Sequence, residues 1–258
     1  MTVMDSFKLN GKIALVTGAA GLIGRQIARA LGEAGATLYR ASRNVDNLQQ
    51  LADQFATEGF RPEVLRLDQT EEASIQETLD LIVGRSGGVD VLVNNAVLRT
   101  MKDFSSPRAD FAKSMAVNGT GLFMMTRIFG DHMARRGRGS IINVGSIQGM
   151  VGPDFTLYQG LQWEAPPDYF FHKGGLLQLT RFAAAKLGPR GVWVNAISLG
   201  GFVAGQDPVF LERYCRRTFL GRMVNSTDLA GAVVFLASDA SAYITGSNIA
   251  VDGGYTAN

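Results

Sequence analysis

The chain of 258 residues is poor in the residue types that bind metals or form disulfides. It holds one cysteine, Cys215, and two histidines, His132 and His172. A single cysteine excludes an internal disulfide and a cysteine metal cluster, and it fits a reducing compartment. The histidines lie too far apart for a metal-ligand spacing. We therefore expect no metal site.

The sequence also lacks an excess of either charge and any long apolar run. Its 25 basic and 23 acidic residues leave a formal net charge of +2, which favours neither a nucleic acid nor a membrane as partner. No apolar stretch is long enough to cross a bilayer. Residues 1–10 include Asp5 and Lys8 and show no signal peptide. We expect a cytoplasmic globular protein.

Short apolar runs alternate with longer amphipathic segments along the whole chain. The runs predict strands at 13–16, 37–41, 63–67, 89–93, 140–144, 193–197 and 248–251. The segments between them predict helices at 23–32, 45–58, 71–83, 111–136, 169–187 and 227–238, the last with Ser226 and Thr227 as candidate caps. Nearly continuous apolar strands fit a parallel sheet buried on both faces. The pattern predicts one α/β domain over 1–258, a doubly wound, Rossmann-type three-layer sandwich with a seven-stranded parallel sheet.

Three glycines, Gly18, Gly21 and Gly24, lie three residues apart between the first strand and the first helix. Glycine permits a tight turn and lets the backbone approach a pyrophosphate, which the helix N-terminus then attracts. The alternative is a glycine-rich turn without a ligand. The strand–turn–helix context favours a dinucleotide site.

The end of the second strand carries no acidic residue to bind a ribose 2′-hydroxyl. It carries Ser42 and Arg43, with Arg40 nearby, which suit a 2′-phosphate because guanidinium pairs with phosphate. We expect NADP(H) as the preferred cofactor and NAD(H) as an alternative. The competing interpretation is that these arginines are ordinary solvated charges at a strand end.

Tyr169 and Lys173 are one helical turn apart, a spacing that is common by chance. Beside a dinucleotide site, a phenol and an ammonium together can move a proton while a nicotinamide moves a hydride. His172 points to another face of the same helix and is interpreted as structural, and His132 as a solvated helix residue.

These motifs, in this order, resemble the short single-domain branch of the short-chain dehydrogenase/reductase family from Gly11 to Gly254. The further matching pieces are Asp68, Asn94-Asn95-Ala96, Asn118, Ser146, Val194-Asn195-Ala196 and Val251-Asp252-Gly253-Gly254. The resemblance implies that Tyr169 is the general acid/base, that Lys173 lowers its pKa, that Ser146 binds the substrate oxygen and that Asn118 holds a relay water. The cofactor-binding set that it implies is Gly18, Gly21, Ile23, Gly24, Ser42, Arg43, Asp68, Asn95, Ala96, Tyr169, Lys173, Gly200, Phe202 and Val203.

The chain departs from the family pattern at four places. Leu22 stands where the short branch has glycine, Val97 follows Asn-Asn-Ala in place of glycine, and Leu199 and Ala204 replace a proline and a threonine. Without that threonine, backbone amides near Phe202 and Val203 are expected to hold the nicotinamide carboxamide. Tyr169 follows Ser146 by 23 residues, more than the family norm.

Tyr158 lies nearer the usual distance from Ser146 but has Gln162, not lysine, four residues on, so Tyr169 is the better acid/base candidate. The extra residues form an inserted loop at about 150–168, which is expected over the substrate. A substrate lid is expected at about 202–223. Its arginines are Arg213, Arg216, Arg217 and Arg222, either an anion-attracting set or solvated charges.

The sequence thus predicts an NADP(H)-dependent oxidoreductase that interconverts a secondary alcohol and a ketone on a small, sugar-like or other polyhydroxylated substrate. Two rivals remain. The glycine spacing also fits a nucleotide-sugar epimerase or dehydratase with tightly bound NAD, and a non-catalytic cofactor sensor would keep the fold. The resemblance implies a homotetramer, or a homodimer, through the helices before and after Ser146.

Overall fold

The computed structural model describes residues 2–46, 48–49 and 62–257. In them, seven parallel strands form one sheet in the order β3-β2-β1-β4-β5-β6-β7. The strands are β1 (Ile13–Thr17), β2 (Thr37–Ser42), β3 (Glu63–Arg66), β4 (Val91–Asn94), β5 (Gly139–Ser146), β6 (Val192–Leu199) and β7 (Asn248–Val251). The predicted doubly wound sheet is confirmed, with strand ends shifted by one to two residues.

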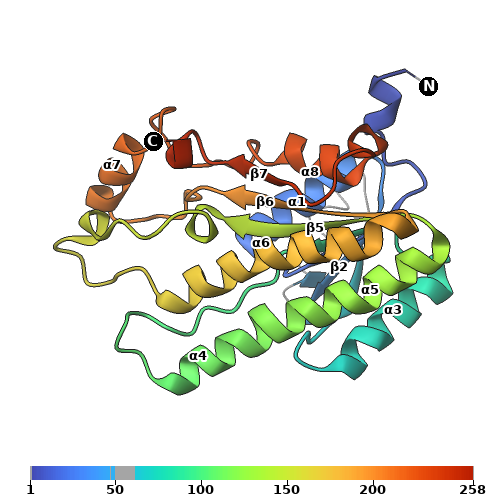
Figure 1. The fold of residues 1–258 in the computed structure, drawn as a ribbon, viewed down its shortest axis with the longest axis horizontal. Coiled ribbons are helices and arrows are strands. Elements are labelled where there is room, and N and C mark those ends of the chain that lie inside the picture. The colour runs from blue at the N-terminus through green and yellow to red at the C-terminus, as the bar shows by residue number, and fades with distance from the viewer. Residues whose placement is uncertain (1, 47, 50–61, 258) are drawn as a thin grey trace.

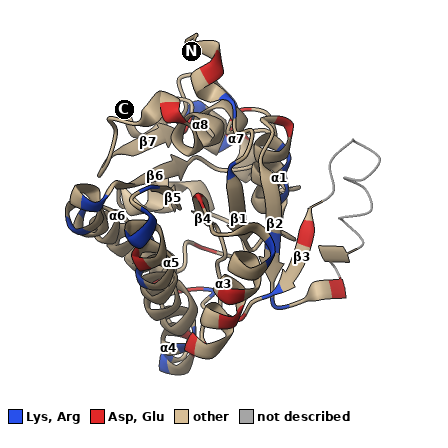
Figure 2. Ribbon diagram, turned by 90° about the vertical axis from the view of Figure 1, so that its right-hand side faces the viewer, with Lys and Arg blue, Asp and Glu red and all other residues tan. Residues whose placement is uncertain are grey.

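Helices cover both faces of the sheet (Figures 1 and 2). They are α1 (Leu22–Glu33), α3 (Glu72–Ser86), α4 (Arg108–Met115), α5 (Leu122–Arg136), α6 (Pro167–Leu187), α7 (Pro208–Arg216) and α8 (Ala230–Ala237). The helices α1 and α8 pack on one face, and α3, α5 and α6 on the other. The predicted helix at 45–58 falls for the most part outside the described residues.

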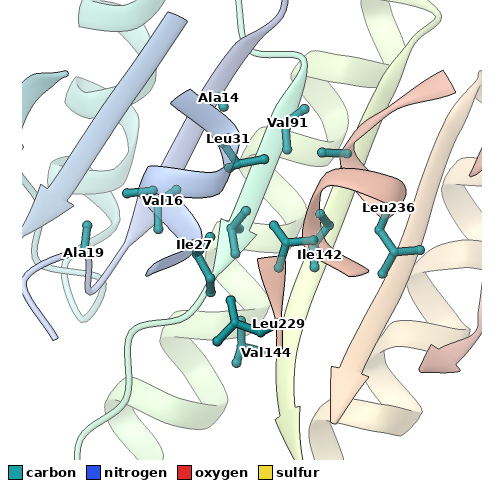
Figure 3. Packing of buried hydrophobic residues seen from close by; sticks show 14 of the residues in the cluster. Ala14, Val16, Ala19, Ile27, Leu31, Val91, Ile142, Val144, Leu229 and Leu236 are labelled. Carbon is teal, nitrogen blue, oxygen red and sulfur yellow. The ribbon is translucent and has the colours of Figure 1, made fainter. Parts of the chain in front are cut away.

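Alternation along the strands explains the two cores. In β1, Ala14 and Val16 face α1 and α8, whereas Leu15 faces α3 and α5. Figure 3 shows the first core, where Ile27 of α1 and Leu236 of α8 meet side chains of the central strands. Each fully buried aliphatic side chain of this kind stabilises the fold by about 1.5–3 kcal/mol. This packing holds the strand ends in fixed positions.

Two local predictions need correction. The segment 111–136 is not one regular helix, because a π turn at Ala116–Gly121 separates α4 from α5. Ser226 and Thr227 do not cap α8, which begins at Ala230 after Leu229; the amide and hydroxyl of Thr227 donate to Asn225 Oδ1. The π turn matters for the site because π turns inside helices occur often at functional positions.

The strand order reverses beside β1, whose neighbours are β2 and β4. In doubly wound sheets, ligands bind at this point, beyond the carboxyl ends of the strands. The chain from 150 to 168 and helix α7 lie at the same edge (Figure 1).

Candidate active site

A cavity of about 610 Å³ lies at the carboxyl edge of the sheet. Most of the residues predicted for the site line it: Gly18, Gly21, Ile23, Gly24, Ser42, Arg43, Asp68, Asn95, Ala96, Ser146, Tyr169, Lys173, Gly200 and Phe202. Asn118 and Val203 do not. The cavity therefore runs from the end of β2, past the glycine turn, to the Tyr–Lys pair.

The glycine turn has no room for side chains at two of its three glycines. Gly18 has a φ of +61°, and a Cβ there would stand 2.7 Å from the Cα of Ala96. A Cβ on Gly24 would strike the carbonyl oxygen of Gly18. Gly21 directly precedes α1, and the first residues of α1 line the cavity. The first N–H groups of a helix have no partner within the helix and are available to a ligand. This cradle of bare backbone at a helix N-terminus fits a pyrophosphate.

Thr17 and Asn95 fix this turn against the end of β4. Thr17 Oγ1 accepts the backbone N–H groups of Asn95 at 3.1 Å and Ala96 at 3.0 Å. Asn95 Nδ2 donates to the carbonyl oxygens of Thr17 at 2.9 Å and Gly18 at 3.1 Å. The side-chain amide of Asn95 thus holds the backbone of the glycine turn in place.

At the end of β2, only part of the expected basic group faces the cavity. Ser42 and Arg43 line it, whereas Arg40 is fully buried and donates from Nη2 to the carbonyl oxygen of Ala19 at 2.8 Å. Burial, together with Arg25, lowers the pKa of Arg40 to about 10. The inclusion of Arg40 among candidate 2′-phosphate ligands was therefore wrong. Asp68 lines the cavity near Arg43, and its pKa is held below the usual value because hydrogen bonds from Thr70 outweigh burial.

Helix α6 carries the Tyr–Lys pair in its first two turns, so Tyr169 and Lys173 share one face. Lys173 is buried, and its Nζ donates to the carbonyl oxygen of Val144 at 2.6 Å. Ser146 ends β5 and lines the cavity with Tyr169, whose pKa it helps to lower. The structure brings these three side chains together at one end of the cavity.

The charges around Tyr169 tune its acidity. Burial alone would raise the pKa of the phenol, but the positive charges of Lys173 and Arg99 outweigh it and the pKa lies below its ordinary value. Burial also lowers the pKa of Lys173, and the neighbouring phenol opposes that shift. Tyr158 behaves in the opposite way, since burial raises its pKa to about 12. Of the two tyrosines, Tyr169 has the lowered pKa and Tyr158 the raised one.

Asn118 sits in the π turn and is buried. Its Oδ1 accepts the N–H of Leu98 at 2.9 Å, and its Nδ2 donates to the carbonyl oxygen of Leu98 at 2.7 Å and to Ser114 Oγ at 3.0 Å. These bonds occupy the side-chain amide. Through them, Asn118 holds the backbone of Leu98, the residue before Arg99, in place.

Sequence reasoning missed Arg99 and misread His132. Arg99 lines the cavity, and its Cζ lies 4.3 Å from the centre of the Tyr169 ring. The only signal was a cation three residues after Asn-Asn-Ala. His132 was predicted to be solvated, which is wrong: it is buried and its Nε2 accepts the N–H of Val89 at 3.3 Å. His172 is buried with its ring centroid 5.1 Å from that of Tyr169, and burial lowers its pKa to about 3.

The inserted loop and α7 form an aromatic wall on the cavity. Tyr158, Trp163 and Phe210 pack with ring centroids 4.8–5.4 Å apart, and all three line the cavity. Arg213 of α7 ties the two segments by donating to the carbonyl oxygen of Gln159 at 2.6 Å. The inserted loop therefore stands where it can contact a substrate.

Among the described residues, no group of three or more histidine, cysteine, aspartate or glutamate side chains could hold a metal ion. The helices in the same part of the chain are too short or too polar to span a membrane. The cavity combines a backbone that fits an anion, at the glycine turn, with a phenol of lowered pKa, that of Tyr169.

Comparison with known proteins agrees with this geometry. A family model with the description "Enoyl-(Acyl carrier protein) reductase" matches residues 18–256. A solved short-chain type dehydrogenase/reductase from Mycobacterium marinum superposes with a TM-score of 0.90 and 33% identity, covering 100% of both chains. The chain belongs to the short-chain dehydrogenase/reductase family. Membership makes it an NAD(P)-dependent oxidoreductase acting on CH–OH groups.

Two relatives of this short-chain dehydrogenase/reductase carry the name gluconate 5-dehydrogenase. The protein from Gluconobacter oxydans is 31% identical, with 99% of each chain covered. The structure from Burkholderia cenocepacia, described in complex with NADP and tartrate, has a TM-score of 0.90 and 32% identity over 100% of both chains.

The departures from the family pattern have visible consequences. Val203 was expected to hold the carboxamide, but its N–H already donates to the carbonyl oxygen of Val224 at 3.1 Å, so this assignment was wrong. Gln206 closes the turn at 202–206: its side chain accepts from Ala204 at 2.8 Å and donates to Phe202 at 2.6 Å. Leu199 is buried in the core, and Val97 faces the cavity.

Proposed function

We propose that this enzyme interconverts a secondary alcohol and a ketone with NADP(H), on a polyhydroxylated substrate, with Tyr169 as the acid/base. The observation that carries the proposal is one cavity lined by Ser146, Tyr169 and Lys173 together with the glycine turn, Ser42 and Arg43. The charge of Lys173 beside the phenol helps to lower the pKa of Tyr169. The relatives named gluconate 5-dehydrogenase, one of them holding NADP, support the sugar-like substrate and the cofactor.

In the oxidising direction, the phenolate of Tyr169 accepts the proton of the substrate hydroxyl. Ser146 donates a hydrogen bond to the same oxygen and keeps it in line with Tyr169. Lys173 stabilises the phenolate by its charge and stays in place through its bond to Val144. A bound nicotinamide supplies the hydride acceptor or donor. Reduction runs the same proton transfer backwards.

The residues that would hold the cofactor belong to the glycine turn and to the ends of β2 and β3. The bare backbone at Gly18 and Gly24 leaves space for a pyrophosphate, and Asp68, which the resemblance implies contacts the adenine, lines the same cavity. Ser42 and Arg43 offer a hydroxyl and a guanidinium to a 2′-phosphate. NAD(H) has no 2′-phosphate for Ser42 and Arg43 to bind, so it should bind more weakly than NADP(H).

An absorbance screen at the nicotinamide band tests the proposal. Both cofactors are paired with sugars, sugar acids, cyclic alcohols and ketones. Turnover of polyhydroxylated substrates with NADP(H) is the expected result. A stoichiometric NAD that survives purification would favour the epimerase or dehydratase alternative, and absence of turnover with every pair would favour a cofactor sensor.

We further propose a cytoplasmic homotetramer, or a homodimer, that assembles through α5 and α6. Phe123 of α5 and Phe171 and Phe182 of α6 leave 43%, 66% and 67% of their surfaces exposed, which supports a partner on this face. Sedimentation of the wild type and of Phe182→Glu tests the assembly; a monomeric wild type would contradict it.

A further inference from the structure

Arg99 occupies an unusual place for a cation. It follows β4 at the carboxyl edge of the sheet, is exposed to the cavity, and has its guanidinium 4.3 Å from the centre of the Tyr169 ring. Its position is fixed on both sides, by Asn118 bound to Leu98 and by Thr100 Oγ1 donating to the carbonyl oxygen of Asp110 at 2.6 Å. The chain therefore presents this charge to the reacting end of the cavity.

The arginines of the lid are already engaged with protein groups. Arg213 donates to backbone carbonyls, Arg216 pairs with Glu212, and Arg222 pairs with Asp228. Arg217 lies 3.6 Å from Asp154, the acid that lines the cavity on this side. These pairs favour Arg99 over the lid arginines as the group that receives an anion.

Within the described part of the chain, no carboxylate lies within ion-pair distance of Arg99. Its neighbours are the aromatic and cationic groups Tyr158, Tyr169, His172 and Lys173, whose titration its charge affects. A cation among such groups, open to a cavity, offers a guanidinium fork to an anionic ligand.

We propose that Arg99 binds a carboxylate of the substrate, so that the enzyme acts on hydroxy acids and keto acids in preference to neutral polyols. The inference rests on the proposed function and names its substrate class. Tyr169 and Arg99 then hold one molecule at two points: the phenol at the reacting oxygen, the guanidinium at the carboxylate. The aromatic wall of Tyr158, Trp163 and Phe210 faces the carbon chain.

This arrangement couples binding to acid–base chemistry. In the free enzyme, Lys173 and Arg99 both lower the pKa of Tyr169, Ser146 adds to this shift, and His172 beside the phenol is neutral. A bound carboxylate neutralises the charge of Arg99 and leaves Lys173 alone. The pKa of Tyr169 is then higher in the complex with an acid than in the complex with a neutral alcohol.

Binding to the enzyme–NADP⁺ complex tests the proposal without turnover. Calorimetry compares tartrate with threitol and gluconate with glucitol, with glucitol 6-phosphate as a third anion. In the wild type, each acid should bind about 10- to 100-fold more tightly than its matched alcohol, the range of a charge-assisted pair. Arg99→Met should abolish the gap, Arg99→Lys should restore part of it, and Arg108→Met, an exposed arginine outside the cavity, should keep it.

A gap that is absent in the wild type, or that survives Arg99→Met, overturns the proposal. If glucitol 6-phosphate binds more tightly than both acids, Arg99 prefers a phosphate, and the proposal that its ligand is a carboxylate is overturned. Where turnover is measured, the pH midpoint of kcat should be higher for acids than for alcohols and equal in Arg99→Met. If acids bind more tightly than alcohols through Arg99 but no substrate is turned over, the proposed function is contradicted and this inference is not. If alcohols are turned over but acids bind no more tightly than alcohols, this inference is contradicted and the proposed function is not.

Discussion

The cofactor half and the substrate half of the cavity are built on different principles. The cofactor half is a backbone structure: Gly18 and Gly24 are required because a Cβ would meet Ala96 or the turn itself. The substrate half is a side-chain structure, in which the inserted loop and α7 hold one another by rings and by Arg213. Both halves join residues far apart in the sequence, Thr17 with Asn95 in the first and Arg213 with Gln159 in the second, but only the first carries a motif that is recognisable locally in the sequence.

The difference teaches where variation can occur. A backbone cradle tolerates few residue types and binds a ligand common to many enzymes. A wall of side chains on loops can change its residues while the scaffold stays the same. Substrate choice is therefore expected to lie in Arg99, Tyr158, Trp163 and Phe210, which line the cavity together with Tyr169 and Lys173.

The largest effect is expected at the cradle. Gly18→Ala forces a side chain into positive φ and against Ala96, so cofactor affinity should fall by more than about 100-fold, measured by fluorescence titration with NADPH. Gly87→Ala is the control, because Gly87 has a φ of +78° but nothing within 4 Å. It should cost only about 1 kcal/mol of stability and leave binding intact. Equal binding losses in both variants would contradict the cradle.

Cofactor choice tests the same half with a smaller effect. Ser42→Asp with Arg43→Ala should reduce the preference for NADPH over NADH by about 10- to 100-fold, since a charge-assisted bond is lost and a like charge faces the phosphate. Arg66→Ala removes a nearby exposed charge that does not line the cavity and should leave the ratio unchanged. A ratio of kcat/KM values that stays constant in the double variant would refute the 2′-phosphate assignment.

At the boundary of the two halves, Lys173→Met should shift the pH dependence of alcohol oxidation. The phenolate is the active form, so the rate rises with pH through the pKa of Tyr169, which lies below its ordinary value. Loss of the Lys173 charge raises that pKa, and a midpoint that moves up by about one pH unit lowers the rate at neutral pH about tenfold. Initial rates across pH measure the midpoint. Lys186→Met, exposed in the last turn of α6, is the control; a midpoint that stays put or falls in Lys173→Met would count against the pair.

The smallest effect is expected where the substrate half is tied together. Arg213→Ala removes bonds to the carbonyl oxygens of Leu157 and Gln159, so the KM for substrate should rise about threefold to tenfold, the loss of one or two hydrogen bonds. Cofactor affinity should not change. Arg216→Ala, whose partner Glu212 lies on the same helix, is the control. An equal change in cofactor affinity would mean that the two halves are not separate.

The same contrast explains what sequence could predict. The strands, the glycine turn and the Tyr169–Lys173 pair follow local rules of periodicity and spacing, and the structure confirms them as elements and as neighbours. The π turn around Asn118 has no such rule, and it was missed. The burial of Arg40 and His132 depends on contacts with Ala19 and Val89, which are distant in sequence.

The site residues follow this pattern too. Arg99 reaches Tyr169 across 70 positions of chain, so neither motif nor spacing reveals it. Val203 was expected to replace the missing threonine with its amide, but that amide donates to Val224, a partner that only the fold supplies. Sequence thus identifies groups whose roles are set by their neighbours along the chain and misses those set by packing.

The central claim is that Tyr169, and not Tyr158, exchanges the proton. Single-turnover hydride transfer, followed at the nicotinamide band with saturating cofactor and substrate, compares Tyr169→Phe with Tyr158→Phe. The account predicts a loss of about 10²- to 10⁴-fold for Tyr169→Phe with unchanged cofactor affinity, and a change of no more than a few-fold for Tyr158→Phe. Near-normal hydride transfer in Tyr169→Phe, or the large loss in Tyr158→Phe, would contradict it.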